Sequence, residues 1–173
     1  MTVTATRAWR RVEPMNDAPA RRRRWPRLLA FALALCAVPA VVLGVQVDDW
    51  TRDLHVNVAE TAPDAPDARL RPLVVSTSPE AARTAIARVA LSFPGWARVA
   101  DDGERLHFER TSALFGFVDD VWVWLEPQPS GELWIQAKGQ SRVGKGDLGQ
   151  NPRTLDALLR GLERELPDAR RVD

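Results

Sequence analysis

Residues 118–126, VDDVWVWLE, decide the fold of this 173-residue chain. Successive side chains of a β-strand point to opposite faces of the sheet. Trp122 and Trp124 therefore share one face of this segment, and Val121, Val123 and Leu125 share the other. A strand that is apolar on both faces is typical of the middle of a sheet, or of a sheet whose second face is covered. We expect this segment to be a central strand.

Three more strands are expected around it. Residues 96–100 and 104–110 flank Asp101-Asp102-Gly103, and an Asp-Gly pair at this position is typical of a tight hairpin. Residues 132–139 follow the turn-rich segment 127–131, PQPSG. Short turns join antiparallel neighbours, so the four segments predict an antiparallel sheet.

Two amphipathic helices are expected, one before the four strands in the sequence and one after them. Before residues 79–92, Thr77 with Glu80 would form a capping box, and Ser78 is the alternative N-cap. Residues 152–166 carry a leucine stripe at helical spacing, with Asn151 as the expected cap. The predicted order is α-β-β-β-β-α: an α+β domain with an antiparallel four-stranded sheet and two helices packed mainly on one face.

The N-terminal part of the chain predicts a transmembrane helix. Residues 1–27 carry eight arginines against two acidic residues, whereas residues 48–173 carry 16 basic and 21 acidic groups. Between them, residues 28–47 contain no charge and as a helix would span about 30 Å. By the positive-inside rule we expect a single pass of a bacterial inner membrane, with the N-terminus inside. A cleaved secretory signal is the alternative, and a lipoprotein anchor at Cys36 a weaker one.

The expected organisation follows from these features. The segment after the apolar run has several prolines and no sustained periodicity, so we expect little regular structure there. Cys36 is the only cysteine, which excludes disulfides from the outer domain. The predicted segments are a basic cytoplasmic tail at 1–27, the transmembrane helix at 28–47, an extracytoplasmic tether at 48–72, the α+β domain at 73–168 and a C-terminal tail at 169–173.

A charged loop punctuated by glycines, residues 141–153, SRVGKGDLGQNPR, follows the last strand and leads into the final helix. Together with FVDDV at 117–121 it resembles the family known as domain of unknown function 1499, found in bacteria and in plant plastids. The resemblance covers residues 70–166. It implies an extracytoplasmic or membrane-associated α+β domain with no established activity. At 138–140 the chain has Lys-Gly-Gln, where the family more often has Arg-Ser-Ala.

The polar residues of these motifs form a candidate cluster for ligand binding or for structure. Asp119 and Asp120 are neighbours in a strand, so they point to opposite faces and cannot act as a catalytic pair. The aspartate that faces the packed side needs a partner for its carboxylate, and Arg142 is the candidate. A structural ion pair is favoured over an anion-binding site or a catalytic role. The members of the cluster are Asp119, Asp120, Arg142, Lys145, Asp147 and Asn151.

Two other interpretations of the loop stay open beside this one. Its glycines are suited to positive φ and close backbone approach, while Arg142 pairs with Asp147 or Asp120. The spacing of Gly139, Gly144 and Lys145 resembles a phosphate-binding loop. Nucleotide hydrolysis is disfavoured, because a glycine follows Lys145 where a magnesium-binding Ser or Thr is needed.

No catalytic residue, metal site or cofactor is predicted. His55 and His107 are the only histidines, and no metal cluster or pairing of a nucleophile with a base can be assembled from their spacing. The acidic outer domain argues against nucleic-acid binding. An apolar contact face is predicted instead, formed by Trp122, Trp124 and Trp134.

Three functions remain open at this point. The favoured one is a non-enzymatic module of the cell envelope that binds a lipid, a small apolar ligand or a protein through the tryptophan face, with Arg142 and Lys145 meeting an anionic group. The second is a hydrolase that uses Asp120, Asp147 and Arg142. The third is a purely structural component of an envelope complex.

Overall fold

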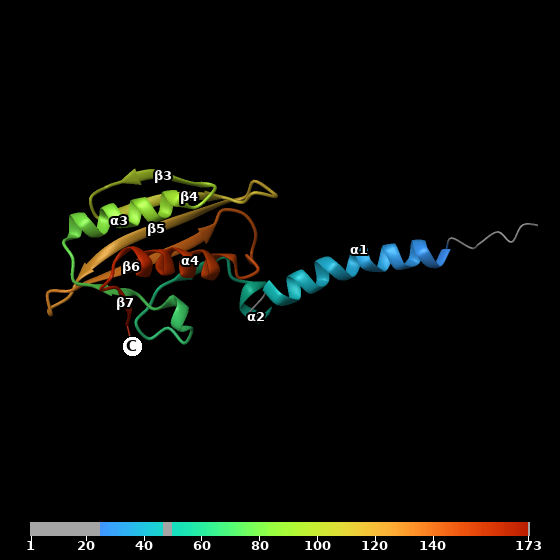
Figure 1. Cartoon of the computed structure of the whole chain (residues 1–173), viewed down its shortest axis with the longest axis horizontal. Coiled ribbons are helices and arrows are strands. Elements are labelled where there is room, and N and C mark those ends of the chain that lie inside the picture. The colour runs from blue at the N-terminus through green and yellow to red at the C-terminus, as the bar shows by residue number, and fades with distance from the viewer. Residues whose placement is uncertain (1–24, 47–49, 173) are drawn as a thin grey trace, which may run out of the picture. The chain divides into compact units, whose positions relative to one another are not determined.

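The computed structural model describes residues 25–46 and 50–172. The chain divides between Pro39 and Ala40 into two units. The second unit contains the sheet (Figure 1). The elements after α1 (Trp25–Gln46) are α2 (Trp50–Asp53), β1 (Val58–Glu60), the 3-10 helix η1 (Ala68–Leu70), β2 (Leu73–Val75), α3 (Pro79–Ser92), β3 (Trp96–Asp101), β4 (Arg105–Thr111), β5 (Val118–Pro127), β6 (Leu133–Ser141), α4 (Gln150–Glu165) and β7 (Arg170–Arg171).

The prediction of a transmembrane helix over residues 28–47 is corrected by the structure. The helix in this region, α1, begins at Trp25 and ends at Gln46, and Val47 lies outside the described residues. Over the described parts of the chain, no helix is both long enough and apolar enough to cross a membrane. The prediction rested on a run of uncharged residues, and such a run does not determine where a helix begins and ends. Most of the predicted tail, residues 1–24, also lies outside the described residues.

The sheet has seven antiparallel strands instead of the predicted four. Its order is β3-β4-β5-β6-β2-β7, and β1 also pairs with β6. The four predicted strands correspond to β3, β4, β5 and β6, and β5 lies between β4 and β6, as expected for a central strand. The three additional strands are two or three residues long. Strands this short show no periodicity in a sequence.

Segments predicted to be irregular supply part of this sheet. The predicted tether, residues 48–72, contains the short elements α2, β1 and η1, and β1 takes part in the sheet. The predicted C-terminal tail, residues 169–173, contains β7, which pairs with β2. Both short strands next to β6 use the same edge of it: β1 pairs with residues 138–140 and β2 with residues 133–135.

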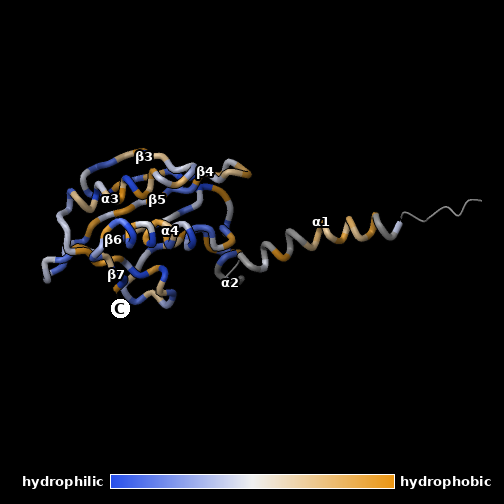
Figure 2. The backbone as a smooth tube through the Cα atoms, viewed as in Figure 1, coloured by the Kyte–Doolittle hydropathy of each residue, from blue (hydrophilic) through white to orange (hydrophobic). Residues whose placement is uncertain are grey.

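The core lies between one face of the sheet and the helices α3 and α4, which cover that face together (Figure 1). In β5, buried residues alternate with half-buried ones, and Figure 2 shows hydrophobic and hydrophilic residues alternating along the strands. Ser78 is the N-cap of α3, and its hydroxyl accepts a hydrogen bond from the Ala81 amide. The largest core side chains are fully buried: Phe108, Leu73, Ile86, Leu106, Ile135, Leu155, Leu158, Leu159 and Leu162.

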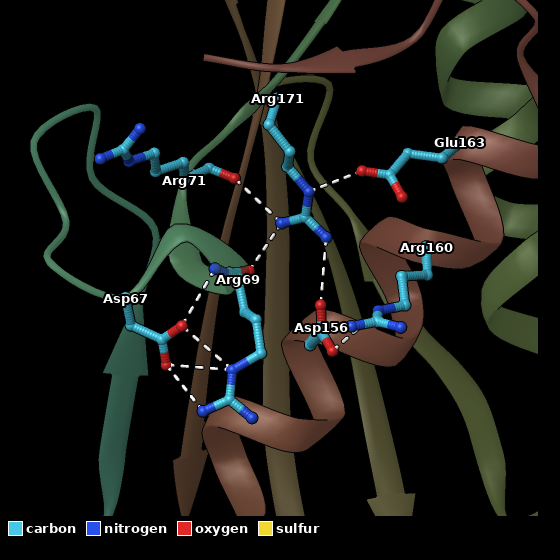
Figure 3. Close-up of polar contacts among 7 residues, drawn as sticks. All are labelled: Asp67, Arg69, Arg71, Asp156, Arg160, Glu163 and Arg171. Atoms are coloured by element: carbon cyan, nitrogen blue, oxygen red, sulfur yellow. Dashed lines mark hydrogen bonds and ion pairs between the residues drawn. The ribbon is translucent and has the colours of Figure 1, made fainter. Parts of the chain in front are cut away.

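The C-terminal strand is held by one arginine (Figure 3). Arg171 donates to Glu163 of α4 at 2.6 Å and to Asp156 of the same helix at 3.2 Å. Its Nη1 also donates to the main-chain oxygens of Arg69 at 2.6 Å and Arg71 at 3.1 Å. One guanidinium therefore joins β7, the segment around η1 and α4, because its planar fork offers donors in several directions.

Candidate functional site

Asp119 and Asp120 point to opposite faces of the sheet, as predicted. Asp119 is buried on the face covered by the helices and forms an ion pair with Arg110, directly opposite it on β4, at 2.9 Å. Asp120 lies on the other face and pairs with Arg142. The predicted partner of the packed-side aspartate, Arg142, is therefore wrong, and the partner is Arg110.

A polar network surrounds Asp120 on the face that α3 and α4 do not cover. Arg142 Nε and Nη2 donate to the two carboxylate oxygens of Asp120, each at 2.7 Å, and Nη2 also contacts Glu109. His107 Nε2 lies 2.7 Å from Asp120 Oδ1. The hydrogen bonds from Arg142 hold the pKa of Asp120 below its usual range, and the two carboxylates raise the pKa of Arg142. Arg142 is thus engaged within the chain.

The three predicted contact tryptophans share this same uncovered face. Trp122 lies opposite His107, and their rings stack with centroids 5.1 Å apart. The guanidinium of Arg105 lies 5.1 Å above the ring of Trp124. Trp134 is half-buried on β6, opposite Glu126. Two of the three rings are therefore already covered in part by polar side chains of β4.

The charged loop before α4 is organised by Asp147. One carboxylate oxygen accepts from the Gly149 amide at 2.9 Å, and the other accepts from the Asn151 amide at 2.7 Å. The N-cap of α4 is Gly149, which has a left-handed conformation and no side chain to act as a cap. Asp147 supplies the missing cap from outside the helix, where a negative charge also favours the helix dipole.

Asn151 lies inside the first turn of α4 and is fully buried, so its predicted role as the cap is wrong. Its Nδ2 donates to the Asn57 carbonyl at 2.8 Å and to the Ser141 hydroxyl at 3.0 Å. Its Oδ1 has no hydrogen-bond partner among the described residues. A Cβ at Gly139 would come within 2.8 Å of that oxygen, so only glycine lets the helix approach β6 so closely. Asn151 therefore joins helix to sheet.

Two glycines of the loop allow it to lie against α2. A Cβ on Gly146 would be 2.6 Å from the Asp53 carbonyl oxygen, and one on Gly149 would be 3.1 Å from the Asp53 carboxyl carbon. The Leu148 amide donates to the Asp53 carbonyl at 2.9 Å. Asp53 itself is buried. The predicted alternative, in which the loop glycines permit close backbone approach, matches this contact.

A pocket of about 420 Å³ opens beside this loop, and we call it the loop pocket. Its lining residues come from two segments. Ser112, Phe115, Phe117 and Val118 lie in or next to the connection from β4 to β5. The others lie within residues 141–153: Ser141, Val143, Gly144, Gly146, Asp147, Leu148, Gln150 and Arg153. Arg110 and Asp119 also line it. Four of its apolar lining side chains are exposed: Phe115 69%, Phe117 53%, Val143 65% and Leu148 37%. Val118 is half-buried. The rings of Phe115 and Phe117 stack at 5.5 Å.

The structure thus brings only some of the predicted site residues together. Asp119 and Asp147 line the loop pocket, whereas Asp120 and Arg142 meet on the uncovered face and do not line it. Lys145 is exposed in the loop. The combination of Asp120, Arg142 and Asp147 that a hydrolase would need is therefore not assembled in one pocket. Within the described residues, no group of three or more His, Cys, Asp or Glu side chains is placed to hold a metal ion.

Several residues of the pocket and of the loop contact were not among the predicted site residues. Arg110 could have been found, because an antiparallel pairing of 104–110 with 118–126 places it opposite Asp119. Phe115 and Phe117 carried a signal as well, since aromatic residues in a connection between strands are available for contact. Asp53 had no signal, because nothing in the predicted tether relates it to a loop almost a hundred residues later.

The fold and the pocket define a class: an α+β domain whose antiparallel sheet is covered by helices on one face, with a pocket at the end of the strands. The chain belongs to the family described as Protein of unknown function (DUF1499), which matches residues 47–162, more than half of the chain. The resemblance noted in the sequence is confirmed. The family description assigns no biochemical activity. No curated protein matches the chain.

Proposed function

We propose that the domain is a non-enzymatic binding module whose ligand is a small apolar molecule held in the loop pocket. The observation that supports this most directly is the set of exposed apolar side chains around the pocket. Phe115, Phe117 and Val143 are each more than half exposed, although they lie beside one another around a single hollow. Apolar pockets with a few polar groups are typical of small-molecule sites.

Binding is favoured over catalysis because the charged groups around the pocket are already engaged. Asp147 uses both carboxylate oxygens to hold the start of α4. Asp119 is paired with Arg110, and Arg153 donates to the Leu148 carbonyl at 2.9 Å. A general base needs to reach the proton that it removes and to be free to accept it. The paired groups are better suited to shaping a site than to proton transfer.

The loop pocket is a better candidate than the tryptophan face predicted from the sequence. The rings of Trp122 and Trp124 are in contact with His107 and Arg105, so a ligand would compete with these contacts. Protein contact through that face stays a prediction. The location at a bacterial inner membrane also stays a prediction, and the proposed binding site does not depend on it.

The proposal is tested with Nile red, an uncharged apolar dye that fluoresces in apolar surroundings. Titration of the full-length chain is expected to show saturable binding. Phe117→Ser is expected to weaken the binding about tenfold. This is the loss expected when one aromatic side chain that the dye would cover is removed. Leu114→Ser is the matched control, because Leu114 is 82% exposed in the same connection but does not line the pocket.

Equal effects of the two substitutions would show that the dye binds elsewhere, and the absence of saturable binding would contradict the proposal. Both side chains are largely exposed, so neither change is expected to alter the melting temperature by more than a few degrees.

A further inference from the structure

One buried carboxylate facing the loop pocket is only half satisfied. The Asp119 side chain is 6% exposed, and its Oδ2 accepts from Arg110 Nη1 at 2.9 Å. Its Oδ1 has no hydrogen-bond or ion-pair partner among the described residues. In the described chain, Asn151 Oδ1 is the only fully buried side-chain oxygen or nitrogen that lacks a partner. Asp119 Oδ1 also lacks a partner, so it is not fully buried and a small part of it is accessible. Because Asp119 lines the pocket, an oxygen without a partner belongs to a residue of the pocket wall.

This acceptor restricts what can fill the pocket. A purely apolar ligand would displace water from Oδ1 and leave a buried acceptor unpaired, which is unfavourable. A ligand carboxylate would place a second negative charge beside the first. A ligand ammonium group would have to lie next to the guanidinium of Arg110, and the other nearby carboxylate, Asp147, is taken up by α4 amides. An uncharged donor meets none of these costs.

We propose that the loop pocket binds an uncharged apolar molecule that carries a hydroxyl group, with the hydroxyl donating to Asp119 Oδ1. This inference rests on the proposed binding function and names the chemical class of its ligand. The apolar body lies against Phe115, Phe117 and Val143, and the hydroxyl provides the orientation. The ion pair with Arg110 fixes the direction of the carboxylate.

The test compares three ligands with the same eight-carbon chain: 1-octanol, octanoate and octylammonium. Each is titrated into the full-length chain at neutral pH by isothermal titration calorimetry. We expect 1-octanol to bind about tenfold more tightly than either charged compound, which is the discrimination typical of one buried hydrogen bond. Octanoate or octylammonium binding as tightly as 1-octanol would overturn the inference.

Asp119→Asn provides a sharper test, because it reverses the polarity of the group. The amide oxygen can still accept from Arg110, and the amide nitrogen then faces the ligand as a donor. The preference for 1-octanol over octanoate is expected to disappear or reverse. Asp120→Asn is the matched control: it makes the same chemical change one residue along the strand on the opposite face, and the ligand order is expected to stay unchanged.

An unchanged ligand order in Asp119→Asn would also overturn the inference. The two proposals fail differently: if none of the three compounds binds and Nile red does not bind, the binding function itself is wrong. If they bind in another order, only the hydroxyl assignment is wrong. Should Asp119→Asn fail to fold, the order measured on the unaltered chain decides the question.

Discussion

At the scale of single residues, two neighbouring aspartates have separate roles because the strand turns them to opposite faces. Asp119 is buried, pairs with Arg110 and keeps one oxygen toward the loop pocket. Asp120 is half-buried and accepts two hydrogen bonds from Arg142, with His107 at 2.7 Å. A substitution at one position therefore tests the binding site, and the same substitution at the other tests the uncovered face.

Asp120 is expected to make part of the stability depend on pH. Arg142, and to a smaller extent His107, lower the pKa of Asp120 in the folded chain. The resulting stability is present above the unfolded-state pKa of about 4 and is lost as the pH falls through the lower folded-state value. Asp120→Asn is expected to reduce the free energy of unfolding by about 1 kcal/mol at pH 7. Urea unfolding of both proteins should show this difference shrinking as the pH falls below about 4.

The prediction is wrong if the difference between the two proteins stays constant or grows on acidification. Such a result would mean that the effect comes from packing around His107 and Trp122, whose rings stack beside Asp120, rather than from the charge.

At the scale of elements, the two helices on the covered face meet closely at one glycine. Gly161 of α4 is buried against α3, and a Cβ there would come within 2.5 Å of Val89 Cγ1. Phe93, just after α3, lies next to the same position. The absence of a side chain at Gly161 thus sets the distance between α3 and α4, although glycine is a poor helix former.

Gly161→Ala is expected to lower the free energy of unfolding by about 1–3 kcal/mol, because the clash with Val89 outweighs the gain of about 1 kcal/mol in helix propensity. Val89→Ala alone should also be destabilising, since it leaves a cavity. The double variant is expected to be more stable than the sum of the two effects by about 1 kcal/mol, measured by urea unfolding. Additive effects would show that the helices do not meet at this pair.

At the scale of the whole molecule, the short strands connect parts of the chain that are far apart in sequence. β1, near residue 60, pairs with the end of β6, and β7, near residue 170, pairs with β2. Arg171 strengthens the second connection through its contacts to η1, its neighbour Arg71 and α4 (Figure 3). Segments from both ends of the domain therefore take part in its sheet, together with the central strands.

Arg171→Lys is expected to lower the free energy of unfolding by about 2 kcal/mol, because a single ammonium group cannot reach acceptors on both α4 and the segment around η1. Arg170→Lys is the matched control, since Arg170 is exposed and pairs only with Glu132 at 2.8 Å among the described residues. Thermal unfolding of the two variants separates the roles. A loss in Arg170→Lys as large as in Arg171→Lys would contradict the proposed closure.

The sequence by itself determined the elements whose pattern is local. α3 was predicted with the bounds that the structure shows, and β3, β4, β5 and β6 were predicted to within about two residues, because alternation and helical spacing are properties of adjacent residues. The family was also recognisable from the motifs at 117–121 and 141–153, whose order and spacing are local features. Two predictions were wrong: the transmembrane helix, which rested on one uncharged run, and the number of strands, because strands of two or three residues have no pattern in the sequence.

Only the tertiary structure decided the rest. It placed β1, β2 and β7 in the sheet, paired Asp119 with Arg110 in place of Arg142, and turned Asn151 from the expected cap into a link with Ser141. It also formed the loop pocket from two connections about thirty residues apart and from a buried aspartate between them. Each of these depends on which segments lie side by side, and that is determined by burial of the whole core rather than by the residues of any one segment.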